Sequence, residues 1–171
     1  MTCVWLHAAQ DPEILLNFHS TMAKKRPSRG RQVAPNDPPT CNCALLCDDV
    51  IESRGRGKHT LVGIIGVIHV RQLPARLGGY VAYVRLSNII GSPKVRIGLD
   101  EAATNEEIFG GNVPLPSRND PLGVYTLIIP VPAFQIERPG RYMFSVKSDG
   151  VPLAESPIMI QAVTTEKEEE Q

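Results

Sequence analysis

The stretch "RPGRYMFSVKSDG" (residues 138–150) alternates apolar and polar side chains. Tyr142, Phe144 and Val146 share one parity, and the other parity holds more polar or flexible residues (Arg141, Met143, Ser145 and Lys147). A period of two is typical of a strand with one face against a core. Asp149-Gly150 then favours a tight hairpin turn before the apolar run "VPLAESPIMIQAV" (151–163). The sequence therefore predicts two antiparallel strands at the end of the domain.

Strand-like segments of the same kind recur upstream, separated by turns that contain Gly or Pro. They are "CNCALLCDDVI" (41–51), "HTLVGIIGVIHV" (59–70), "GYVAYVRLS" (79–87), "KVRIGLDEA" (94–102) and "VYTLIIPVP" (124–132). None of them has the period of an amphipathic helix. About seven short strands in this arrangement predict an all-β protein, an antiparallel immunoglobulin-like β-sandwich.

Three segments have a predicted place in this fold. Residues 59–70 are apolar on both parities and rich in β-branched side chains, which indicates one central strand. Pro130 has no amide proton to donate, so residues 124–132 are expected at a sheet edge. The segment "NIIGSP" (88–93) is expected to form a turn.

Tyr142 supports the sandwich prediction. It follows Gly140 by two residues, near the start of a late strand, as in the tyrosine corner of immunoglobulin-like sandwiches. Its hydroxyl should therefore donate a hydrogen bond to nearby backbone. A cysteine late in the chain, which could bridge two sheets, is missing from the sequence.

One folded domain is expected in the 171 residues, over residues 40–163. We expect residues 1–39 to be a disordered or wrongly assigned leader, with the true start at Met22, because the segment after it is polar and rich in Pro. A short helix is the alternative for residues 1–21, since three of them have helical spacing (Ile14, Leu15 and Phe18). Residues 164–171 are expected to be a disordered acidic tail. No secretory signal or long apolar run is present, which indicates the cytoplasm.

Charge is concentrated outside the expected domain. Residues 22–39 hold five Lys and Arg against one Asp, a net charge of +4, and residues 164–171 hold four Glu against one Lys, a net charge of −3. Basic side chains in a flexible segment neutralise phosphates without reading a sequence. Weak binding of a nucleic acid or another polyanion through the basic segment is therefore one candidate function.

Three cysteines lie within seven residues: Cys41, Cys43 and Cys47. In a regular strand they share one face, and Cys41 and Cys43 are about 7 Å apart along it, too far to ligate one zinc ion without a bend. Structural zinc sites usually use two C-x₂₋₄-C pairs, and the chain has no second pair. We interpret the three as small apolar side chains and expect no metal and no cofactor. In the alternative, His59 or His69 would complete a metal site.

Motifs of catalysis are missing from the sequence. It contains no G-x-S-x-G and no P-loop, and its four His occur singly. Asp48 and Asp49 raise a calcium or acid–base alternative, but no D-x-D-x-D-G loop surrounds them, and solvated residues at a strand end are the simpler interpretation. We predict that the protein is not an enzyme.

Two stretches, "CALLCDDVIESRGRGKHTLVGIIG" (43–66) and "PGRYMFSVKSDGVPLAESPIMI" (139–160), resemble a family of uncharacterised bacterial proteins. Its members begin with a Cys-Asp-Asp strand and close with a Gly-x-Tyr strand and an Asp-Gly hairpin. The resemblance covers residues 42–163. It implies a cytosolic β-sandwich and no assigned activity.

Residues 102–123 are expected to form a long irregular connection. This segment carries Phe109 before two glycines and then the polar cluster Arg118, Asn119 and Asp120. An apolar anchor beside a charged rim is typical of a contact surface, so we predict a loop that contacts a partner. In the alternative, Phe109 folds back over an open sheet edge. The predicted function is a cytoplasmic, non-enzymatic interaction or structural module.

Overall fold

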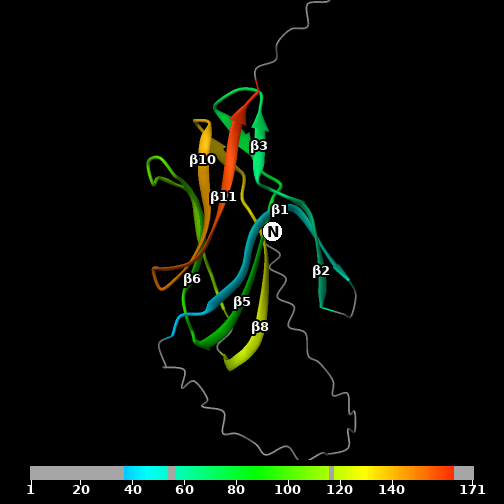
Figure 1. The fold of residues 1–171 in the computed structure, drawn as a ribbon, viewed down its shortest axis with the longest axis vertical. Helices are drawn as coiled ribbons and strands as arrows, with labels where there is room; N and C mark the ends of the chain where they lie inside the picture. The colour runs from blue at the N-terminus through cyan, green and yellow to red at the C-terminus, as the bar shows by residue number, and fades with distance from the viewer. Residues whose placement is uncertain (1–36, 54–56, 116–117, 164–171) are drawn as a thin grey trace, which may run out of the picture.

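The computed structural model describes residues 37–53, 57–115 and 118–163, all of them in strands, turns or irregular segments (Figure 1). Of the segments predicted to be disordered, 1–39 and 164–171, residues 1–36 and 164–171 lie outside the described residues, as does the predicted start at Met22. The strands are β1 (Thr40–Ser53), β2 (Lys58–Ile64), β3 (Val67–Val70), β4 (Ala75–Leu77), β5 (Val81–Gly91), β6 (Val95–Glu101), β7 (Glu107–Val113), β8 (Arg118–Pro130), β9 (Phe134–Ile136), β10 (Gly140–Ser148) and β11 (Val151–Ala162). The prediction of an all-β protein is confirmed.

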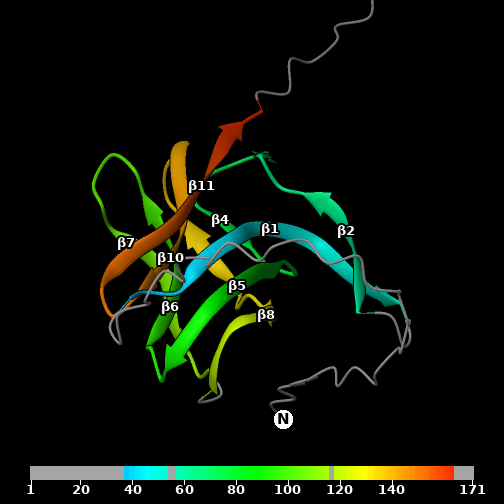
Figure 2. The ribbon, with the colours of Figure 1, turned by 60° about the horizontal axis from the view of Figure 1, so that its bottom comes forward.

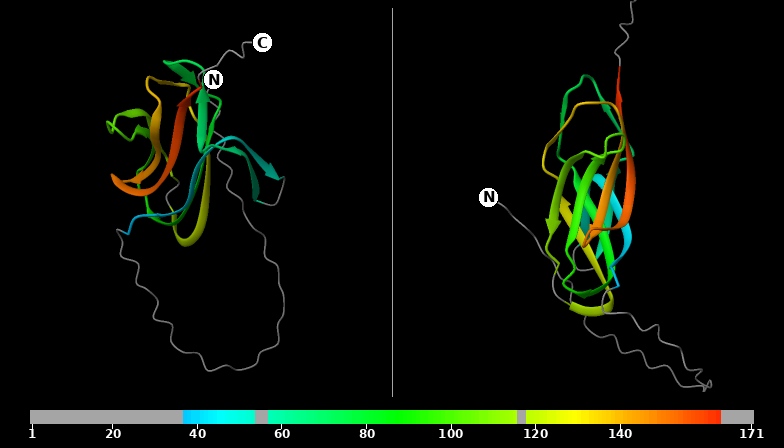
Figure 3. Two further views of the ribbon diagram at one scale, coloured as in Figure 1. Left: turned by 45° about the horizontal axis from the view of Figure 1, so that its top comes forward. Right: turned by 90° about the vertical axis from the view of Figure 1, so that its left-hand side faces the viewer.

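Two sheets form the body of the domain. One has the strand order β2-β1-β5-β8, the other has the order β3-β11-β10-β6-β7, and β4 and β9 form a separate pair. The strands of both sheets run roughly along the long axis of the domain (Figures 1 and 3). Buried side chains from the two sheets form one hydrophobic cluster, which includes Leu46, Val84, Leu86, Leu99, Phe144 and Ile158. The sheets therefore pack on each other around a shared core.

The predicted hairpin at the end of the domain is confirmed. β10 pairs with β11 antiparallel, with Tyr142 opposite Ile158. Asp149 and Gly150 have positive φ angles of 47° and 83°, the backbone that a tight hairpin turn requires. The Tyr142 side chain is 1% exposed, and its hydroxyl donates a 2.7 Å hydrogen bond to the backbone carbonyl of Arg138. The predicted tyrosine contact is therefore present.

The prediction of one central strand over residues 59–70 is wrong. The segment forms two strands, β2 and β3, which lie at the edges of different sheets. Gly63 has a φ of 61°, which L side chains rarely adopt, and it lies just before the chain leaves the first sheet. The crossing is held by two backbone hydrogen bonds, from Ile65 N to Leu46 O (2.8 Å) and from Met159 N to Gly66 O (2.9 Å). β3 pairs with β11 in parallel, so the second sheet is mixed rather than antiparallel.

Two predicted loops are also strands. The supposed turn over residues 88–93 is largely the end of β5, where a register shift accommodates Asn88 with a φ of 57°. The long connection expected over residues 102–123 holds β7 and the start of β8. The sequence pattern does not indicate β7, because the Gly110-Gly111 pair interrupts the alternation of apolar and polar side chains. β8 lies at the edge of its sheet, as Pro130 predicts.

The β1–β2 hairpin extends beyond the body of the domain. β1 has 14 residues, and only its first half pairs with β5. Cys47 pairs with both Val81 of β5 and Ile64 of β2, and the part from Asp49 opposite Val62 to Ser53 opposite Lys58 pairs with β2 alone among the described residues. Figure 2 shows β1 arching over β5 and β8 before it turns back into β2. The base of this hairpin is where the chain crosses to the other sheet.

Candidate functional site

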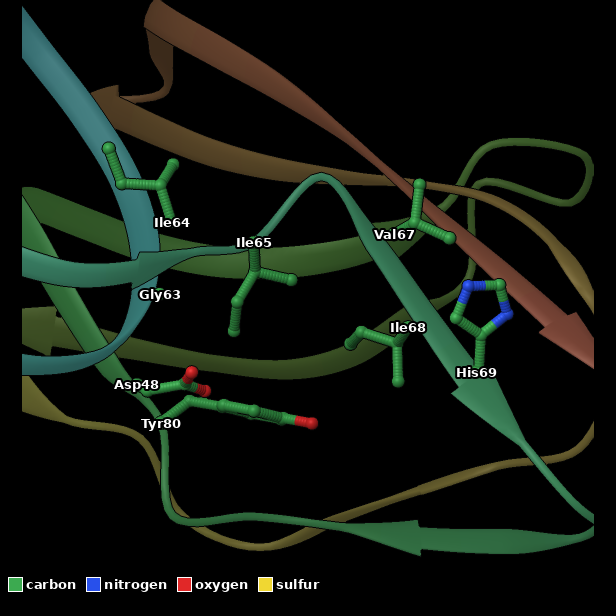
Figure 4. A pocket seen from close by; sticks show the side chains of 8 residues that line it. All are labelled: Asp48, Gly63, Ile64, Ile65, Val67, Ile68, His69 and Tyr80. Carbon is green, nitrogen blue, oxygen red and sulfur yellow. The ribbon is translucent and has the colours of Figure 1, made fainter.

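A pocket of about 300 Å³ lies at the base of the β1–β2 hairpin, where the chain crosses from β2 to β3 (Figure 4). Asp48 of β1 and Tyr80, which precedes β5, contribute its polar atoms together with His69 of β3. The remaining lining comes from the crossing segment and is apolar apart from the backbone (Gly63, Ile64, Ile65, Val67 and Ile68). The pocket therefore combines one carboxylate, one phenol and one imidazole with isoleucine and valine walls.

The position of the Asp48 carboxylate depends on Gly63. The two residues lie across from each other between the pairs Cys47–Ile64 and Asp49–Val62. A Cβ atom added to Gly63 would lie 2.7 Å from Cγ of Asp48 and overlap its Oδ2. The carboxylate therefore occupies the space that a side chain at position 63 would need, and glycine there is required both by its φ angle and by this contact.

Tyr80 lies beside this carboxylate. Figure 4 shows the Asp48 carboxylate next to the Tyr80 ring, with Ile65 and Ile68 on the other side of the pocket. The pKa of Tyr80 is raised, first by burial of the phenol and second by the negative charge of Asp48. The ring packs against Phe134 with centroids 6.2 Å apart, and the Tyr80 carbonyl accepts a 2.9 Å hydrogen bond from Val131 N. The contact with Phe134 thus holds the Tyr80 ring against the core.

The pocket has a buried wall and an exposed rim. Ile68 is 9% exposed and Ile65 packs on the core, whereas Ile64 and Val67 are 58% and 50% exposed. His69 lies at the far end of the pocket from Asp48 (Figure 4). This arrangement does not bring an acid and a base to one reacting atom. It suits a ligand that has a cationic head for Asp48 and the Tyr80 ring, and an apolar stem for the isoleucines.

The predicted contact residues do not come together in one loop. Phe109 lies in β7 opposite Leu99, and its ring packs 5.1 Å from that of Phe134. Residues 118–120 lie in β8, opposite residues 91, 90 and 89 of β5, and their side chains are outside what the structure describes. The prediction of one irregular contact loop is therefore wrong in structure. The packing of Phe109 favours the alternative, in which the ring covers the core, and a role of Arg118, Asn119 and Asp120 in partner contact stays a prediction.

Cys43 and Cys47 share one face of β1, as predicted, but Cys41 does not share it. A register shift lies between Cys41 and Cys43. Cys41 packs against the core and donates a 3.4 Å hydrogen bond to the Cys43 carbonyl, while the buried Cys47 thiol donates one of 3.4 Å to the Val81 carbonyl. Burial raises the pKa of both Cys41 and Cys47. Within residues 37–53, 57–115 and 118–163, no group of three His, Cys, Asp or Glu side chains could hold a metal ion.

Sequence patterns identify only part of the pocket. Asp48 stands out as a carboxylate in an apolar run, but it lies inside β1 rather than at a strand end. Tyr80 has no distinctive sequence pattern of its own, because one tyrosine next to a strand is common. The only available signal is the Gly78-Gly79 pair before it, which indicates a close approach of the chain: a Cβ atom at Gly78 would lie 3.1 Å from Cβ of Ala133.

Comparison with known proteins gives the family of the chain. Residues 42–161 match the model of a family of unknown function (DUF6941). The chain belongs to this family. The predicted resemblance to an uncharacterised family over residues 42–163 is confirmed in extent, and the family description assigns no activity. No curated protein matches the sequence.

The chain has a weak likeness to solved structures. One of them is the Pseudomonas fluorescens alkylpurine DNA glycosylase AlkC bound to DNA containing an abasic site analog, with 15% sequence identity and a TM-score of 0.33. The match covers 57% of this chain and 28% of that chain. Similarity at this level carries no functional argument.

None of the described residues forms a helix that is long and apolar enough to cross a membrane.

Proposed function

We propose that the protein is a non-enzymatic interaction module of the cytoplasm, which binds an extended segment of a partner protein along β2. The observation that carries this proposal is the edge of the projecting hairpin. β2 is the last strand of its sheet, and within the part of the chain that the structure describes it pairs with β1 alone. An unpaired edge offers its backbone amides and carbonyls to an added strand, which gains affinity from main-chain hydrogen bonds.

Exposed apolar side chains accompany this edge. Ile51, Val62 and Ile64 are 53%, 40% and 58% exposed, and Val67 follows at the start of β3. The antiparallel register places Ile51, Val62 and Ile64 on one face of the hairpin. Single exposed apolar residues are ordinary, whereas several on one projecting face favour an interaction surface.

The charged side chains of the body support a non-enzymatic role. Arg96 pairs with Glu107, Lys147 with Asp100 at 3.1 Å, and Arg138 with Glu101 at 2.8 Å. Glu101 also accepts a 2.7 Å hydrogen bond from Thr104. These pairs join neighbouring strands or close a turn, so their side chains act in the fold rather than facing a common substrate.

A photo-crosslinking experiment tests the proposal. The full chain, with p-benzoylphenylalanine in place of Ile64, should crosslink to one defined protein in cells. The matched control carries the same group in place of Val151, which is 51% exposed at the opposite end of β11 from β3, and should not form that product. With the purified partner, Ile64→Lys should raise the Kd at least tenfold, because a charge at a strand edge opposes pairing, and Val151→Lys should leave it unchanged.

Two results would contradict this assignment. One is the same set of crosslinked proteins from positions 64 and 151. The other is retention of the protein on heparin that falls with salt and disappears when the Lys and Arg of residues 22–39 are replaced by Gln. That second result would support the polyanion-binding alternative, which depends on phosphate neutralisation.

A further inference from the structure

We propose that the pocket beside β2 binds a cationic side chain, a Lys ammonium or an Arg guanidinium group, and so selects partner segments that carry such a residue. The source of the cation rests on the function proposed above. The chemistry of the pocket stands on its own residues, Asp48, Tyr80 and the isoleucines. The pocket would select for a cationic residue, whereas the edge of β2 supplies sequence-independent main-chain pairing.

Asp48 is a carboxylate with no basic side chain paired to it among the described residues. Asp100, Glu101 and Glu107 each pair with a Lys or Arg. The neighbouring Asp49 carboxylate accepts a 2.8 Å hydrogen bond from the Val50 amide. The Asp48 carboxylate has neither a hydrogen bond nor an ion pair to the described residues, although it lies in the middle of a paired strand. Asp48 is an exposed residue whose backbone is held in β1, so its carboxylate is open to a cation that approaches from solvent.

The surroundings of Asp48 match a cation that has an apolar stem. The Tyr80 ring lies beside the carboxylate, so a cation at Asp48 can also contact an aromatic face (Figure 4). Ile65 and Ile68 provide apolar walls against which methylene groups can pack. A volume of about 300 Å³ is at the small end of the range for ligand pockets, and it accommodates a single long side chain.

The pocket also lies where a bound segment would pass. Ile64, the last residue of β2, lines the pocket and is 58% exposed. A strand paired along β2 directs alternate side chains to opposite faces of the sheet. One of its side chains can therefore enter the pocket at the end of β2 while the others remain on the apolar face of the hairpin.

Titration with a small probe tests the pocket without any partner. Isotope-labelled full-length protein is titrated with n-butylguanidinium, and with 1-pentanol as a neutral control, while the Ile65 and Ile68 methyl signals and the Gly63 amide are followed by NMR. The cation should produce saturable shifts at these positions, and pentanol should produce none confined to them. Asp48→Asn should weaken binding about fivefold, the upper range for an exposed ion pair.

Matched variants separate the pocket from general charge. Asp49→Asn removes the neighbouring carboxylate, which does not line the pocket, and should leave the affinity for n-butylguanidinium unchanged. Tyr80→Phe should retain binding because the aromatic face remains, and Tyr80→Leu should weaken it. Equal shifts with pentanol, or equal effects of Asp48→Asn and Asp49→Asn, would overturn the inference, and unchanged spectra elsewhere show that each variant is folded.

The two proposals fail separately. A partner that crosslinks at position 64 in a protein whose pocket ignores n-butylguanidinium would refute the cation site and leave edge binding intact. Binding of the probe that depends on Asp48, in a protein whose partner tolerates Ile64→Lys, would refute edge binding and leave the cation site intact.

Discussion

Replacing Tyr142 by Phe removes a single hydrogen bond from the core, and its cost can be worked from the structure. The ring is 1% exposed and stays in place, so no large cavity forms. The lost interaction is the 2.7 Å bond from the hydroxyl to the Arg138 carbonyl. The net contribution of one such hydrogen bond to stability is typically about 1 kcal/mol. We therefore expect a loss of about 1 kcal/mol in the free energy of unfolding.

Equilibrium unfolding in urea measures this loss, with the free energy taken from the midpoint and the slope. For a domain of this size, 1 kcal/mol corresponds to a decrease in Tm of about 3–5 °C. Tyr80→Phe is the matched control, because the Tyr80 hydroxyl has no hydrogen-bond partner among the described residues, and its cost should stay within about 0.5 kcal/mol. Equal stabilities of the two variants would refute the assigned role of the Tyr142 hydroxyl.

Three further predictions concern other parts of the molecule. Gly63→Ala should lower the free energy of unfolding by about 2 kcal/mol or more, because position 63 has a positive φ angle and the added Cβ overlaps Asp48. Adding Asp48→Ala should recover only the part of this loss that comes from the overlap. Strict additivity of the two changes in a double-mutant cycle, measured by urea unfolding, would show that the two residues do not touch. Phe109→Ala should cost about 2–3 kcal/mol, because its half-buried ring packs on Phe134; a change below about 0.5 kcal/mol in the same assay would leave partner contact as the better interpretation. The pKa of Tyr142 is raised in the folded protein, mainly by burial. Its contribution to stability is therefore complete below the unfolded pKa of about 10 and is lost as the pH rises through the folded value. Urea midpoints from pH 8 to 11 should fall less steeply for Tyr142→Phe than for the wild-type chain, and parallel curves would contradict the shift.

Local sequence determines the parts of the fold whose signals lie within one or two strands. The β10–β11 hairpin follows from alternation and from Asp149-Gly150, since the turn needs two positive φ angles. The buried face of β6 follows in the same way, and Val95, Ile97 and Leu99 are each at most 5% exposed. These features are predictable because one face of each strand meets the core, which a period of two records directly.

The tertiary structure decides where a segment leaves one sheet and enters another. Residues 59–70 are apolar on both parities whether they form one central strand or two edge strands that cross between sheets. The crossing depends on bonds to Leu46 and Met159, which are remote in the sequence. β7 is likewise formed by pairing with β6 rather than by its own propensity, because Gly110 and Gly111 lack side chains to alternate.

The pocket is decided by tertiary structure for the same reason. Asp48 and Tyr80 are 32 positions apart and belong to segments that local patterns assign separately. Their approach requires β1 and β5 to pair in one register and Phe134 to hold the Tyr80 ring from the far side. A single sequence records which side chains can carry charge or pack in a core. The pairing of distant strands, whose free energy comes from contacts shared across both sheets, determines which of those side chains meet.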